Sequence, residues 1–149
     1  MAEAFRDAKP GALIVLDEPS SGLHPADVAP VLSVIDRLVA RGDTVVAIEH
    51  DMRVAASADV VIDLGEGAGT LGGRIVAEGT PEQVAAASTR TSPFMAQALL
   101  GQLEVPAPRV REDSPRLPHT LEVVRAREHN LRDVSVSLPR NQLIAVTGP

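Results

Sequence analysis

Two adjacent carboxylates follow a continuous apolar run near the start of the 149-residue chain. The run covers residues 12–16, and Asp17 and Glu18 come directly after it. An aspartate at the end of a buried strand can hold Mg²⁺ through its water shell, and a neighbouring glutamate can orient or deprotonate an attacking water. The pair therefore suits nucleotide hydrolysis. Taken alone, it is explained better as capping or solubilising acids in a strand-to-helix loop.

A second apolar run, residues 44–48, is followed by a histidine, His50. Because the carboxyl ends of parallel strands meet at one edge of a sheet, we expect His50 to lie at the same edge as Asp17 and Glu18. A histidine at this position can hydrogen-bond a γ-phosphate oxygen. A lone histidine is more simply a capping or surface residue, so the functional interpretation depends on the combination of the three side chains.

The surrounding pattern predicts an α/β fold with a mostly parallel sheet. Apolar runs at 12–16, 44–48 and 59–64 are typical of strands buried on both faces. Between the first two, apolar residues recur at helical spacing from Pro25 to the glycine at position 42. Pro30 is expected to delay or kink the start of that helix. A short helix over 52–57 completes the alternation of strands and helices.

Composition excludes several functional classes. The formal net charge is −6 and the chain has no Trp or Tyr, which argues against a nucleic-acid surface on this chain by itself. Cysteine is absent, so disulfides and thiolate metal sites are excluded, and a cytoplasmic location is expected. No apolar run approaches the roughly 20 residues that span a bilayer.

The pattern changes in the last third of the chain. Residues 103–118 contain four prolines among charged residues, which is typical of a linker. After them, short apolar stretches alternate with turn residues and predict antiparallel strands. The sequence thus predicts three parts: residues 1–104, a Pro-rich linker at 105–120, and a short β segment at 121–149.

The ordered motifs LDEP, SSGLHP and EH together resemble the ABC-type ATPases. On that resemblance Asp17 is the Walker B aspartate, which holds Mg²⁺ and ATP through water, and Glu18 is the catalytic glutamate. His50 is the switch-loop histidine. The D-loop is formed by Ser20, Ser21, Gly22, Leu23 and His24.

One longer stretch narrows the resemblance. The sequence VIDLGEGAGTLGGRIVAEGTPEQV is similar to the DNA-repair branch, the A subunit of the UvrABC excinuclease and its paralogues, some of which are linked with drug self-protection. Residues 124–148 are similar to the stretch by which that family enters its second ATPase module. The resemblance implies a partial P-loop NTPase fold, with 1–104 as the C-terminal part of one module and 121–149 as the first strands of the next.

A phosphate-binding loop, G-x-x-x-x-G-K-[ST], is not found in the sequence, and its only lysine is Lys9. The LSGGE signature and the zinc-binding cysteines of the family are missing as well. We therefore expect a fragment or split subunit of an excision-repair ATPase, with no zinc site and little or no activity by itself. ATP and Mg²⁺ are expected to bind only when a Walker A-bearing partner completes the site.

The resemblance also implies partners. Another ABC ATPase half or a second copy is expected, whereas DNA and a UvrB-like protein are expected only through an intact family member. A membrane is not. Two alternatives stay open: the ATPase component of a membrane transporter, against which the GAG..GG stretch argues, and a non-catalytic module that docks on an intact paralogue.

Overall fold

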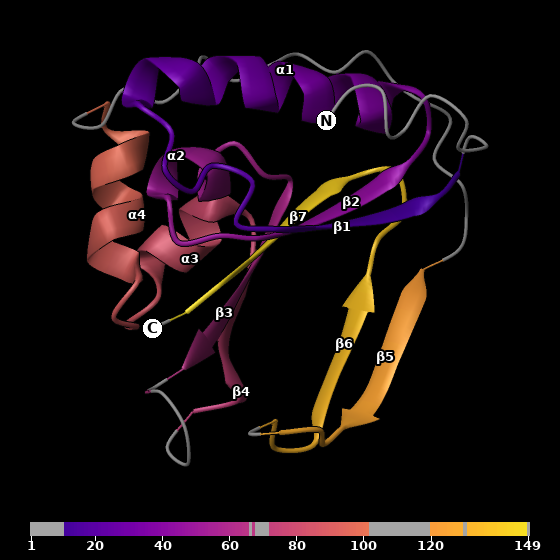
Figure 1. Ribbon diagram of the computed structural model, residues 1–149. Coiled ribbons are helices and arrows are strands. Elements are labelled where there is room, and N and C mark those ends of the chain that lie inside the picture. Colours follow the sequence, from indigo (N-terminus) through magenta and orange to yellow (C-terminus); the bar gives the residue numbers. More distant parts are fainter. Residues whose placement is uncertain (1–10, 66, 68–71, 102–119, 130, 149) are drawn as a thin grey trace.

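The computed structural model describes residues 11–65, 67, 72–101, 120–129 and 131–148 of the chain. These residues form two sheets, a five-stranded sheet of order β1-β2-β7-β3-β4 and a two-stranded sheet of β5 and β6 (Figure 1). The strands are β1 (Leu13–Asp17), β2 (Thr44–Ile48), β3 (Val60–Gly65), β4 (Arg74–Gly79), β5 (Leu121–Ala126), β6 (Val134–Leu138) and β7 (Leu143–Thr147).

The larger sheet is mostly parallel, as the sequence predicts. β1 pairs with β2, β2 with β7, and β7 with β3 in parallel register, and only β4 joins β3 antiparallel. Because β1, β2, β7 and β3 run in the same direction, their carboxyl ends lie along one edge. The fold is therefore α/β with a small antiparallel sheet added.

The described part of the chain also contains four helices: α1 (Pro25–Ala40), α2 (Met52–Ala55), α3 (Pro81–Ala86) and α4 (Ser92–Leu99). The expected delay at Pro30 is not seen, since α1 begins at Pro25 and continues to Ala40. Pro30 removes one helical hydrogen bond, but it and Ala26, four residues earlier, are exposed, so water can satisfy the freed carbonyl. Side-chain caps set the starts of α2, where Asp51 accepts from the Arg53 amide, and of α3, where Thr80 and Gln83 form a capping box.

Apolar side chains fill both faces of the larger sheet. On one face, the buried stripe of α1, including Leu32 and Ile35, packs in a cluster with Val45 and Leu143 of the strands. On the other face, Ile144 belongs to a cluster that also includes residues of β5 and β6. Figure 1 shows α1 along one side of the sheet and the β5–β6 hairpin on the other. The core is thus built around the central strands.

The central strand β7 is the last one in the sequence. It lies between β2 and β3, and Leu143, Ile144 and Ala145 are at most 1% exposed. Its entry is fixed by the amide of Asn141, which donates to the Thr44 hydroxyl at 3.0 Å. The tail therefore packs on the strands of the first part of the chain. The predicted linker at 105–120 lies outside the described residues except for Thr120, so the division into three parts remains a prediction.

Within the described ranges, no helix has both the length and the apolar content that crossing a membrane requires.

Candidate functional site

Asp17, Glu18 and His50 lie at the carboxyl edge of the larger sheet. Asp17 ends β1 in register with Ile48 at the end of β2, and the Glu18 amide donates to the Ile48 carbonyl at 2.9 Å. The Glu18 carboxylate oxygen Oε1 is 3.6 Å from His50 Nδ1. The two side chains are 52% and 65% exposed, respectively, so both can reach a ligand in solvent. The structure thus brings the three predicted residues to one edge.

Glu18 has an unusual backbone conformation. Its φ is +44°, in the left-handed region that side chains other than glycine rarely adopt. The turn is closed by the Ser21 amide, which donates to the Glu18 carbonyl at 3.0 Å. Such strain persists only where surrounding contacts impose it, and it often occurs at functional sites. Here it turns the chain sharply at the end of β1.

The donor set around Asp17 fits one kind of metal ion. Asp17 is exposed, and among the described residues no group of three or more His, Cys, Asp or Glu side chains is placed to hold a metal. Mg²⁺ commonly binds proteins through one or two carboxylates and completes its shell with water and phosphate oxygens. The residues present therefore fit a nucleotide-associated Mg²⁺ rather than a metal held by protein ligands alone.

The predicted D-loop divides into one buried and four exposed residues. Ser20 is 6% exposed and bonds inward, whereas Ser21, Gly22, Leu23 and His24 face solvent. His24 also caps the N-terminus of α1, because its Nδ1 accepts a hydrogen bond from the Ala26 amide at 3.3 Å. The loop thus presents a short exposed run between two anchored ends.

Glu49 is the residue that sequence reasoning missed. Its side chain is 2% exposed and accepts hydrogen bonds from the Ser20 amide, the Ser20 hydroxyl and, at 3.4 Å, the Asp51 amide. It therefore connects the loop after Glu18 to the loop that carries His50. Burial alternates here, with Glu49 inward between the exposed Ile48 and His50, but the continuous apolar run before it gave no sign of this alternation.

The end of β7 reaches the same edge. The Glu49 amide donates to the Val146 carbonyl at 2.9 Å, and Thr147 is in register with Asp63 of β3. Gly148 approaches β3 so closely that a Cβ on it would lie 2.1 Å from the Leu64 carbonyl oxygen. A glycine is required at this approach, because any side chain would collide with backbone.

The charge next to His50 is fixed by an ion pair. Burial by itself would raise the pKa of Asp51, but hydrogen bonds from the Arg53 side chain and backbone outweigh it and hold the pKa below its usual range. The Asp51 carboxylate also caps α2 by accepting from the Arg53 amide at 2.9 Å. Asp51 thus stays ionised at neutral pH and anchors the loop of His50.

The parallel sheet, with these side chains at its carboxyl edge, defines a partial ABC-type ATPase fold. The structure is similar to the crystal structure of UvrA2 from Deinococcus radiodurans, with a TM-score of 0.59 and 50% identity over 61% of this chain and 11% of that one. In sequence, the chain is 41% identical over 140 residues to UvrABC system protein A of Aquifex aeolicus, covering 93% of this chain and 14% of the relative. It is 44% identical over 138 residues to the Bradyrhizobium diazoefficiens protein of the same name, and the match covers 93% of this chain and 13% of that relative.

The chain belongs to the UvrA family of ABC-type ATPases. It spans about one seventh of the length of the two curated relatives named above. No family model matches it.

Proposed function

We propose that this chain supplies the water-activating side of an ATPase site in a UvrA-like protein of nucleotide excision repair. The observation that carries the proposal is the approach of the Glu18 carboxylate to 3.6 Å from the His50 imidazole, beside Asp17 at the edge of a parallel sheet. In the proposed roles, Glu18 accepts a proton from the attacking water and His50 donates a hydrogen bond to a phosphate oxygen.

The geometry supports these roles for the chain's own residues. Glu18 and His50 are both exposed on the same side of the edge, so one water could contact the carboxylate while the imidazole reaches a phosphoryl group. Asp17, one residue earlier, is placed to bind the water shell of Mg²⁺, which would neutralise phosphate charge when nucleotide is bound. Glu49 holds the two loops at a fixed separation.

The described residues do not supply a phosphate-binding loop, since none of them forms a glycine-rich loop with a lysine. We therefore infer that a Walker A-bearing partner, another ABC ATPase half, completes the site. The exposed D-loop residues, Ser21 to His24, would face that partner. Contacts with DNA and a UvrB-like protein are proposed only for the whole relative, and no zinc site is proposed. The similarity to UvrABC system protein A argues against the transporter alternative.

The proposal is tested by measuring Mg–ATP binding and turnover with the purified chain. The chain is used alone and mixed with a polypeptide that carries a Walker A loop and signature motif but no functional catalytic glutamate. We expect turnover only in the mixture, and loss of turnover with Glu18→Gln. Glu78→Gln is the matched control, because Glu78 is an exposed acid on β4.

Two results would contradict the proposal. Turnover by the chain alone that requires Glu18 would show that no partner is needed. Absence of turnover in the mixture, with Mg–ATP binding no tighter than to the partner by itself, would favour a non-catalytic docking module.

A further inference from the structure

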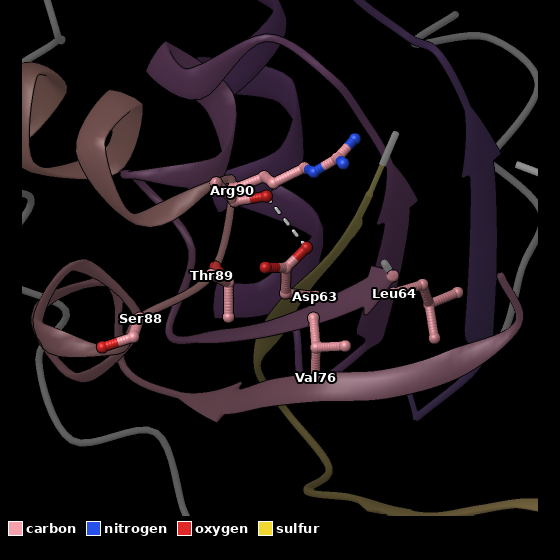
Figure 2. Close-up of a pocket in the computed structure, with 8 residues that line it drawn as sticks. Asp63, Leu64, Val76, Ser88, Thr89 and Arg90 are labelled. Atoms are coloured by element: carbon pink, nitrogen blue, oxygen red, sulfur yellow. Dashed lines mark hydrogen bonds between the residues drawn. The ribbon is translucent and has the colours of Figure 1, made fainter. Parts of the chain in front are cut away.

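A second candidate site lies on the other side of β7 from His50. It is a cavity of about 510 Å³ between the end of β3, the middle of β4 and the loop from Ser88 to Thr91 that joins α3 and α4. Figure 2 shows Asp63 at its centre, facing that loop, with Val76 below it. None of the residues proposed to act on nucleotide lines this cavity.

The carboxylate of Asp63 is buried, and only one of its two oxygens accepts a hydrogen bond. The residue is 1% exposed, and its Oδ1 accepts a hydrogen bond from the Thr91 hydroxyl at 2.9 Å. Its Oδ2 has no hydrogen-bond partner, and no basic side chain among the described residues forms an ion pair with it. A buried carboxylate in this state is costly unless a donor pairs with it, and a charged donor stabilises it most.

The other walls indicate what kind of donor fits. Val76 supplies apolar surface, and Ser88 and Thr89 of the loop line the opposite wall. Arg90 also lines the cavity, but its guanidinium extends away from Asp63 (Figure 2). A divalent cation held by protein ligands alone would need several of them, and no such group is found among the described residues. One carboxylate beside an apolar wall instead suits an organic cation with a short alkyl stem.

We propose that this cavity binds an ammonium or guanidinium group, whose N–H donates to Asp63 Oδ2 while its stem packs on Val76. The group can come from a free small amine or from a Lys or Arg side chain of another polypeptide segment. Because Asp63 and Thr147 are in register at the ends of β3 and β7, a cation bound here would lie close to the end of the central strand.

The test is an NMR titration of the ¹⁵N-labelled chain with n-propylammonium chloride, followed at the amides of residues 63–65 and 88–91. Tetramethylammonium chloride at equal ionic strength is the control, since it has the same charge but no N–H donor. We expect saturable shifts with propylammonium and none with tetramethylammonium. Capped lysine (N-acetyl-lysine amide) is the second probe: tighter binding than propylammonium indicates a polypeptide side chain as the source, and weaker binding indicates a free amine.

Variants make the proposal falsifiable. Asp63→Asn should weaken propylammonium binding by about tenfold or more, because a charge-assisted hydrogen bond is lost. Glu78→Gln, which removes an exposed carboxylate of β4, should leave it unchanged, as should Arg90→Ala. Equal shifts with tetramethylammonium, or unchanged binding in Asp63→Asn, would overturn the proposal. Loss of binding in Arg90→Ala would do so too.

If Asp63→Asn does not fold, as judged by circular dichroism, Thr91→Val is tested in its place. Thr91→Val keeps the carboxylate and removes the hydroxyl that competes for it, so propylammonium should bind about threefold more tightly. Weaker binding in Thr91→Val would overturn the proposal. Neither experiment involves ATP, so its outcome is independent of the proposed ATPase role.

Discussion

Glu49 and Ser20 are joined by two hydrogen bonds that connect the two loops of the candidate site. Glu49 Oε1 accepts from the Ser20 amide at 2.8 Å, and Oε2 accepts from the Ser20 hydroxyl at 2.9 Å. Both residues are buried, so neither bond competes with solvent. Because Ser20 follows Glu18 by two positions and Glu49 precedes His50, this pair sets the separation of the two proposed functional side chains. Hydrogen bonds to a buried charged acceptor are stronger than neutral ones.

We predict that Glu49→Gln lowers the free energy of unfolding by about 2 kcal/mol, because a neutral amide turns one acceptor into a donor that faces the Ser20 donors. The loops of residues 18–24 and 49–51 should lose order together. Urea unfolding measures the first effect, and hydrogen exchange at the Ser20 and Asp51 amides measures the second.

Glu78→Gln is the matched control for this change, since it removes an exposed carboxylate from β4. It should alter stability by less than about 0.5 kcal/mol. If Glu49→Gln were equally mild, and if exchange at the Ser20 amide were unchanged, the connection between the loops would not depend on Glu49.

The second prediction concerns pH. The folded-state pKa of Asp51 is lowered, so the folded form favours the carboxylate and the stability from its pairing with Arg53 is fully present above the unfolded pKa of 3.8. That contribution is lost as the pH falls from 3.8 through the lower folded pKa. Asp51→Asn keeps an acceptor for capping α2 but removes the charge, so it should cost about 1 kcal/mol at pH 7.

Urea unfolding at pH 7 and at pH 3 measures the difference between the two proteins. The difference in the free energy of unfolding between the native chain and Asp51→Asn should become smaller as the pH falls below 3.8. A gap that stayed constant, or widened at low pH, would show that the charge of Asp51 does not stabilise the fold. Glu78→Gln again serves as the reference for removing an exposed acid.

The strands and the main edge of the site could be predicted from the sequence, because their signals are local. Continuous apolar runs predicted β1, β2 and β3 within a residue or two. The rule that parallel strands share a carboxyl edge then predicted that Asp17, Glu18 and His50 lie together. Only the pairing of β1 with β2 is needed for this, because Asp17 and Glu18 follow β1 and His50 follows β2.

Two features could not be predicted, because they depend on pairing between distant residues. The run at 143–147 falls within the segment predicted as antiparallel strands, but it forms a parallel strand between β2 and β3. Nothing in the run specifies this insertion, which comes from packing both faces of the strand. The unpaired oxygen of Asp63 is similarly hidden, since the residue lies inside an apparently ordinary strand. Among the described residues its side-chain partner is Thr91, 28 positions later. In both cases the deciding contact is non-local.

The third prediction tests the central position of β7. Ile144 is fully buried, so Ile144→Ala should lower the free energy of unfolding by about 3 kcal/mol through lost burial and the cavity it leaves. Val124→Ala, on β5, removes methyl groups that are largely exposed and should cost less than about 0.5 kcal/mol. Urea unfolding compares the two variants. Equal and small effects would mean that the tail forms a unit apart from the larger sheet.

The last prediction concerns the strained backbone of Glu18, where stability and the proposed activity should move in opposite directions. With φ at +44° and a half-exposed side chain, Glu18→Gly relieves strain and loses little packing, so the free energy of unfolding should rise by about 0.5 to 1 kcal/mol. Turnover with a Walker A-bearing partner should be lost. Asp17→Gly is the control, because a glycine in β1 should instead destabilise by about 1 kcal/mol. If both variants were destabilised alike in urea, the left-handed turn would not be what holds the Glu18 carboxylate toward His50.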